Sequence, residues 1–113
     1  MRTQEEAFAI FREAVEECRK VLDGKLRDAY LYGSYARGDF HEWSDIDILL
    51  TVDMTPEELT KYRHLISIVN NDLSLKYDVT VSTTAKPLEQ FNRYADVMPY
   101  YRNVLREGIR YGA

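Results

Sequence analysis

The chain has 113 residues and a net charge of −4, and 45% of its residues are hydrophobic while 30% are charged. The acidic balance argues against autonomous binding of nucleic acid, and no apolar run approaches the roughly 20 residues that cross a bilayer. We therefore expect one globular domain over residues 1–113, without a membrane partner. Its single cysteine and the lack of a signal-peptide pattern predict a cytoplasmic location.

The first element expected is a long helix near the N-terminus. Thr3 and Glu6 have the spacing of a capping box, in which each side chain bonds the backbone N–H of the other residue. Apolar residues then recur at helical spacing, and Gly24 stands where a C-terminal cap belongs. Cys18 lies on the apolar stripe, so we expect it in the core.

Two strands are expected next, with a glycine turn after the first. The first strand lies within residues 26–32 and ends at Gly33, and the second covers residues 45–51. Because alternate side chains of a strand point to the same face, Asp45 and Asp47 share one face of the second strand.

The rest of the chain predicts a helix, a third strand and further helix. A second capping box at Thr55 begins a helix, and the apolar stripe of this helix continues to Leu73. Residues 75–82 alternate between apolar and polar and predict a half-buried strand. After Pro87 the chain returns to helix in short pieces that end at Gly108. This order predicts an α/β fold with helices packed on a small sheet.

Three acids on the polar faces of the predicted strands are the candidates for chemistry, namely Asp45, Asp47 and Asp78. If the two strands are neighbours, as sequential strands often are, the three carboxylates converge. Each pair at about 4 Å would cost roughly 4 kcal/mol at an effective dielectric of about 20, so the group must bind protons or a cation. An all-oxygen cluster suits Mg²⁺ or Mn²⁺. The alternative is that these acids are unconnected surface residues.

The turn before the acids, GSYARG at residues 33–38, is a candidate phosphate site. Gly33 lets the backbone turn and approach a ligand closely. The amides from Ser34 onward, which open a short helical turn, can bond phosphate oxygens together with the Ser34 hydroxyl. Arg37 is a candidate for a charged contact to a phosphate, or else a surface ion-pair residue.

Residues 33–47, GSYARGDFHEWSDID, fit the pattern G-S-x(10)-D-x-D. This segment resembles the signature of the DNA polymerase β-like nucleotidyltransferases, and in particular of the minimal nucleotidyltransferase (MNT) domains. The resemblance extends to YDVTV at residues 77–81 and to YYRNVLREGIRYG at residues 100–112, so it covers nearly the whole chain. It implies a small mixed β-sheet with helices packed against it.

The resemblance also implies a metal-dependent nucleotidyltransferase that transfers AMP from ATP to a hydroxyl. Gly33 and Ser34 would hold the phosphates of the nucleotide. Asp45 and Asp47 would bind the divalent metal ion with the triphosphate, and Asp78 would complete the metal site and assist deprotonation of the attacking hydroxyl. The reaction would be an in-line displacement in which pyrophosphate leaves.

The partner expected for this chain also follows from the resemblance. Small MNT proteins are typically encoded beside a helical HEPN partner, often a toxin ribonuclease, which they neutralise, in some cases by transferring AMP to one of its tyrosines. We therefore expect an antitoxin of this kind. Two alternatives stay open. The chain could be a non-catalytic module that inhibits its partner by contact, or a small-molecule, aminoglycoside-type nucleotidyltransferase that works as a homo-oligomer.

Aromatic residues at two places have no assigned role. We expect Trp43 to pack against the loop before the acids. Tyrosines near the C-terminus belong either to the core and its rim or to an exposed patch for a partner; they are Tyr94, Tyr100, Tyr101 and Tyr111.

Overall fold

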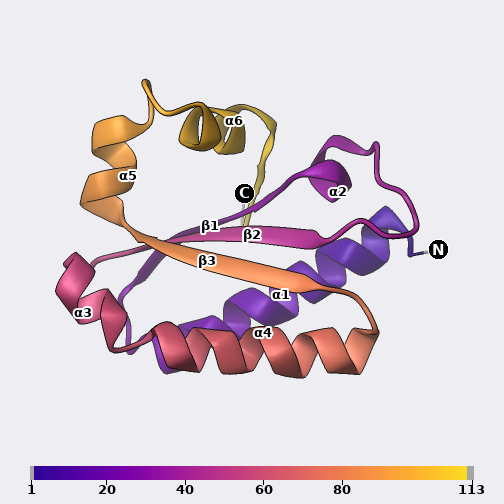
Figure 1. Ribbon diagram of the computed structural model, residues 1–113, viewed down its shortest axis with the longest axis horizontal. Helices are drawn as coiled ribbons and strands as arrows, with labels where there is room; N and C mark the ends of the chain where they lie inside the picture. Colours follow the sequence, from indigo (N-terminus) through magenta and orange to yellow (C-terminus); the bar gives the residue numbers. More distant parts are fainter. Residues whose placement is uncertain (1, 112–113) are drawn as a thin grey trace.

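The computed structural model describes residues 2–111, in which helices and strands form a layered α/β fold (Figure 1). Within these residues one mixed sheet has the strand order β3–β2–β1–β4. The strands are β1 (Leu26–Tyr32), β2 (Ile46–Val52), β3 (Val81–Pro87) and β4 (Ile109–Arg110). β1 is antiparallel to β2 and to β4, whereas β2 and β3 are parallel. The predicted fold class is confirmed.

Helices cover both faces of the sheet (Figure 1). α1 and α4 pack together on one face, while α5 and α6 lie on the other, and the short helices α2 and α3 follow β1 and β2. The helices are α1 (Gln4–Val21), α2 (Ser34–Arg37), α3 (Pro56–Thr60), α4 (Arg63–Tyr77), α5 (Leu88–Tyr94) and α6 (Pro99–Glu107). None of the helices in the described range is long and apolar enough to cross a membrane.

α1 begins at the predicted capping box. Thr3 Oγ1 accepts a hydrogen bond from the Glu6 N–H at 3.1 Å, and the Glu6 carboxylate accepts one from the Thr3 N–H at 3.2 Å. Cys18 is fully buried on the inner face of the helix, and this burial raises the pKa of its thiol to about 12. The expectation that Cys18 belongs to the core is confirmed.

The alternating side chains of β2 face two different layers. Ile46, Ile48 and Leu50 belong to the main core under α1 and α4. Leu49 points the other way and packs with buried residues of α5 and α6. Asp47 and Leu49 are two residues apart on β2, so their side chains point to the same face of the sheet. The Asp47 carboxylate therefore lies on the face that α5 and α6 cover.

The helix expected from Thr55 to Leu73 is two helices. α3 begins with the predicted capping box, in which Thr55 Oγ1 accepts from the Glu58 N–H at 3.1 Å. The chain turns at residues 61–62, and α4 then continues past Leu73 to Tyr77. The predicted start of the helical segment was right, and its continuity and its end were wrong.

The third predicted strand exists as β3, but of its predicted range, residues 75–82, only Val81 and Ser82 lie in it. The first three residues of that range form the last turn of α4, where Leu75 is 84% exposed. Asp78 ends that helix in the left-handed conformation, with φ at 51°, and β3 begins only at Val81. The alternation of apolar and polar residues therefore runs across the end of a helix, where it does not indicate a strand.

β3 is an edge strand, and α4 binds the backbone groups that point away from the sheet. Asn70 Nδ2 donates to the Thr83 carbonyl at 3.2 Å, and Asn70 Oδ1 accepts from the Thr83 N–H at 3.0 Å. Ser74 Oγ accepts from the Val81 N–H at 2.9 Å. Unpaired strand edges are templates for pairing with other chains, so these side chains protect this edge.

Asn70→Ala should lower the free energy of unfolding by about 1–3 kcal/mol, because it leaves the N–H and the carbonyl of Thr83 without these partners. Denaturant unfolding measures the change. Asn71→Ala is the matched control, since Asn71 is an exposed neighbour on the same helix, and it should change stability by less than about 0.5 kcal/mol. Equal losses in both variants would contradict a role for Asn70 at the strand edge.

Candidate active site

The turn after β1 has the shape that the sequence predicts. Gly33 has φ at 82° and ψ at −160°, a region that is essentially restricted to glycine. α2 begins at the next residue, and the N–H groups of Ala36 and Arg37 both bond the Gly33 carbonyl at 3.1 Å. Tyr35 is buried and stacks on Phe40 with ring centroids 4.6 Å apart. Tyr35 belongs to the main core, and its burial there anchors the turn to the domain.

Asp47 lies directly against this turn. A Cβ atom added to Gly33 would be 2.5 Å from Asp47 Oδ2, so the carboxylate takes up the space that any other residue at this position would need. The residue level with Asp47 on β1 is Tyr32, and on β3 it is Ser82. The structure thus brings the glycine turn and one predicted acid into contact.

The charge of Asp45 acts on the carboxylate of Asp47. Asp45 is exposed and lies just before β2, whereas Asp47 is half-buried within the strand. Burial raises the pKa of Asp47, the charge of Asp45 raises it further, and the charge of Arg37 lowers it. A cation bound between two such carboxylates relieves their repulsion.

These two acids suit a metal ion that arrives with a nucleotide. Among residues 2–111, no group of three His, Cys, Asp or Glu side chains is arranged to hold a metal ion. Mg²⁺ is usually bound in proteins by one or two carboxylates together with substrate phosphates. Asp47 lies beside a turn that offers backbone N–H groups, and Asp45 two residues before it supplies a second carboxylate, so this chemistry fits Mg²⁺ with a triphosphate.

Asp78 does not join these acids, which corrects the expectation that three carboxylates converge. Asp78 is exposed and caps α4, which packs on the face of the sheet opposite to that of Asp47. The β3 residue beside Asp47 is Ser82. The expectation failed because it placed Asp78 on a strand that begins only at Val81.

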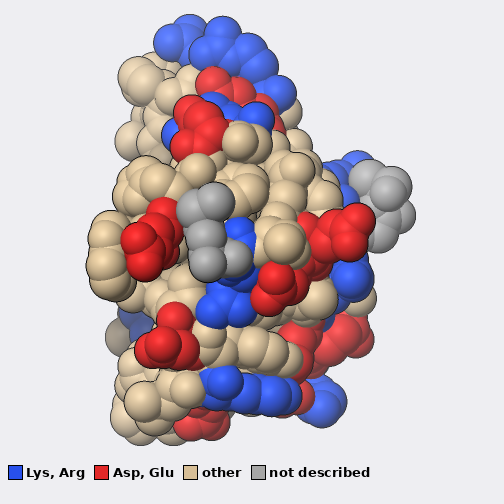
Figure 2. Space-filling view, turned by 90° about the vertical axis from the view of Figure 1, so that its right-hand side faces the viewer, with Lys and Arg blue, Asp and Glu red and all other residues tan. Residues whose placement is uncertain are grey.

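Arg37 is held by two acids at the rim of the site. Its Nε pairs with Asp39 at 3.2 Å, and its Nη1 pairs with Glu107 of α6 at 3.5 Å. Figure 2 shows acidic and basic side chains interspersed over the end of the molecule where α2 lies. Because exposed ion pairs of this kind are weak, a phosphate can compete with these carboxylates for the guanidinium.

Two tyrosines next to Asp47 were not predicted as part of the site. Tyr32 and Tyr100 place their hydroxyl oxygens 3.0 Å apart, and their rings meet edge to face at 5.5 Å. Burial raises the pKa of both hydroxyls, and the charge of Asp47 adds to this effect. Tyr32 could have been found because it directly precedes Gly33. Tyr100 comes from the distant α6, and only the fold reveals its position.

The other aromatic residues divide between the core and the surface. Tyr101 is buried in the cluster beneath α5 and α6, and Tyr111 packs edge to face on Phe11 at 6.0 Å. Tyr94 is 40% exposed, so these tyrosines include both buried and exposed residues. Trp43 is 80% exposed, and the expectation that it packs against its loop is wrong.

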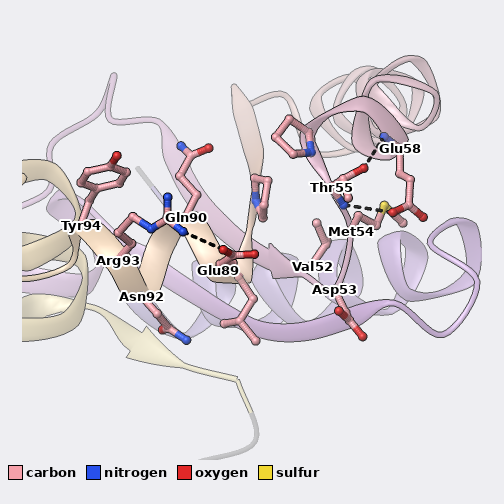
Figure 3. Close-up of a pocket in the computed structure, with 13 residues that line it drawn as sticks. Val52, Asp53, Met54, Thr55, Glu58, Glu89, Gln90, Asn92, Arg93 and Tyr94 are labelled. Carbon is pink, nitrogen blue, oxygen red and sulfur yellow. Dashed lines mark hydrogen bonds and ion pairs between the residues drawn. The ribbon is translucent and has the colours of Figure 1, made fainter.

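A hollow of about 720 Å³ lies at the other end of the strands, between α3 and α5 (Figure 3). It begins beside Val52, five residues along β2 from Asp47, which corresponds to roughly 17 Å of strand. Figure 3 shows Arg93 paired with Glu89 and Glu58 bonded to Thr55 at the start of α3, and the distance between Arg93 and Glu89 is 2.7 Å. The hollow is therefore separate from the acids and the glycine turn.

Comparison with known proteins identifies the family. The family model described as "Nucleotidyltransferase domain" matches residues 11–110. The chain belongs to the nucleotidyltransferase family. A candidate protein adenylyltransferase of Methanocaldococcus jannaschii, MJ0604, is 35% identical to this nucleotidyltransferase over 97 residues, which cover 86% of this chain and 89% of the relative.

Solved structures share the fold of this nucleotidyltransferase. A candidate nucleotidyltransferase from Sulfolobus solfataricus superposes with a TM-score of 0.65 at 21% identity, covering 96% of this chain and 81% of that one. A toxin–antitoxin structure solved with AMP-PNP superposes with a TM-score of 0.57 at 21% identity, covering 87% of this chain and 69% of the other. At these identities the likeness establishes the fold.

Proposed function

We propose that this nucleotidyltransferase transfers AMP from ATP, with Mg²⁺ or Mn²⁺, to a tyrosine hydroxyl of a helical HEPN-type toxin and so acts as its antitoxin. The observation that carries the proposal is the contact between Gly33 and Asp47, which joins a candidate phosphate turn to a candidate metal ligand. The relative named as a protein adenylyltransferase and the fold shared with a toxin–antitoxin complex support it.

Each residue of the site has a defined part in the proposed reaction. Asp45 and Asp47 would hold the divalent ion, which when bound neutralises charge on the triphosphate and on the leaving pyrophosphate. The turn at Gly33 and Ser34 would orient the phosphates through backbone N–H groups and the serine hydroxyl. The acceptor oxygen then forms a bond to the α-phosphorus, and the bond from that phosphorus to the β-phosphate oxygen breaks.

A phenol suits this site as the acceptor. Ser82 is the β3 residue level with Asp47, and Asp78 is the C-terminal cap of α4. A phenol ionises near pH 10, far more readily than an aliphatic hydroxyl. A tyrosine acceptor therefore needs less help from a protein base, and its proton can leave to solvent.

Calorimetric titration of the protein with ATP tests the first step of this proposal. We expect binding that requires Mg²⁺, because each acid supplies only part of a metal site that the phosphates complete. The Asp45→Asn, Asp47→Asn double variant should lose this binding while keeping its fold. Binding of ATP that is equally strong without metal, or that the double variant retains, would contradict the proposed site.

A second candidate function is inhibition of the partner by contact alone. This alternative is supported by the finding that, within residues 2–111, no group of three His, Cys, Asp or Glu side chains is arranged to hold a metal ion. Neutralisation of the toxin by the same double variant separates the two functions. Loss of neutralisation with the complex still forming supports transfer of AMP, and full neutralisation by the variant supports contact inhibition.

A further inference from the structure

α6 contacts the nucleotide end of the sheet at two points. Tyr100 near its start bonds the hydroxyl of Tyr32, the last residue of β1. Glu107 at its end pairs with Arg37 of α2 at 3.5 Å. The two residues are seven positions apart and so lie on one face of the helix. This face of α6 borders both the strand that leads into the turn and the turn itself.

The hydroxyl pair of Tyr32 and Tyr100 has one O–H that is not used within the pair. A phenol carries a single donor, so one hydroxyl donates to the other across the 3.0 Å contact and the second proton is left over. Asp47 is the cross-strand partner of Tyr32, and side chains directly opposite on a sheet are neighbours. The O–H group that is left over therefore lies near the Asp47 carboxylate.

We propose that Tyr32 and Tyr100 are nucleotide-binding residues, which hold α6 against β1 and present the spare O–H to the triphosphate gathered at Asp47. This inference rests on the proposed function, because it requires a triphosphate at that carboxylate. A hydrogen bond from a hydroxyl to a charged phosphate oxygen is stronger than one between neutral groups, so its removal should be measurable in the affinity for ATP.

The phenylalanine variants separate this role from simple packing. Both rings are half-buried and meet edge to face, and phenylalanine keeps that ring while it removes only the hydroxyl. Tyr30→Phe is the matched control. Tyr30 lies on the same face of β1, but its neighbours are Leu49 across the strand and the stacked ring of Phe91 at 6.0 Å.

The experiment measures the Kd for ATP with Mg²⁺ by calorimetry and the midpoint of thermal unfolding for each variant. Tyr100→Phe should weaken ATP binding about tenfold or more, as expected for a lost hydrogen bond to a charged group. Tyr32→Phe should have a similar effect, because either hydroxyl can be the donor within the pair, and the double variant should bind about as weakly as each single variant because the pair acts as one unit. Tyr30→Phe should bind as the wild type does.

The outcomes distinguish this inference from the proposed function. If the wild type binds ATP and Tyr100→Phe binds it equally tightly, the inference is overturned and the proposed function stays intact. An equal loss of affinity in Tyr30→Phe would also overturn it, since the effect would then be one of packing. A lower unfolding midpoint with unchanged Kd would assign the pair a structural role only. No binding by the folded wild type would overturn both the proposed function and the inference.

Discussion

Asp47→Asn should reduce nucleotidyl transfer roughly a thousandfold or more, the size of effect expected when a metal ion that supplies several kcal/mol to the transition state is lost. The amide keeps the shape of the side chain but removes the charge that would hold the cation. Asp47 is the acid that lies in the sheet, against the Gly33 turn. The assay follows the labelled α-phosphate of ATP into whichever acceptor the wild type modifies.

Asp78→Asn is the control for this substitution, and it should leave transfer within about twofold. Asp78 is exposed at the end of α4, and asparagine tolerates its left-handed conformation. The two variants therefore carry the same chemical change at two acids that were both predicted from the sequence as metal ligands. A large loss of transfer in a folded Asp78→Asn protein would mean that the working enzyme brings Asp78 to the other two acids, contrary to the structure.

Gly33→Ala should lose most of its affinity for ATP and some of its stability. The added Cβ would meet Asp47 Oδ2 at 2.5 Å, so the carboxylate must leave its position. The backbone conformation of Gly33 is also one that alanine rarely adopts, which costs on the order of 1–3 kcal/mol. We expect ATP binding to fall at least tenfold, a change that corresponds to about 1.4 kcal/mol, as measured by calorimetry on the folded variant.

Gly24→Ala separates these two effects. Gly24 also has a positive φ, 76°, but nothing lies within 4 Å of a Cβ atom added there. This variant should lose stability through backbone strain and keep its affinity for ATP. If Gly33→Ala also kept its affinity, the position of the Asp47 carboxylate would not matter for nucleotide binding.

Local patterns in the sequence predicted the parts of the fold that local interactions decide. The capping boxes at Thr3 and Thr55 begin helices because a side chain bonds a backbone N–H three residues away. The glycine turn at residue 33 follows from the steric freedom of that residue alone. Asp47 was found for the same reason, since strand alternation places it on the face opposite to the main core, to which Ile46, Ile48 and Leu50 belong.

The parts that the sequence did not predict depend on long-range contacts or on a helix end. Asp78 sits at the border of α4 and β3, where a helical and an alternating pattern both fit the same few residues. Tyr100 reaches Tyr32 across 68 positions of the chain, and no periodicity within either segment signals that contact. Ser82 became a neighbour of Asp47 only once the parallel register of β2 and β3 was known.

The attachment of α6 at two points has a thermodynamic consequence. Any displacement of this helix must disturb the Tyr100–Tyr32 contact, the Glu107–Arg37 pair, or both. A molecule that binds the outer side of α6, where Leu105 is 47% exposed, and shifts the helix will therefore change the affinity for whatever binds at the turn. By linkage the effect is reciprocal, so occupancy of the turn changes the affinity of the outer surface by the same factor.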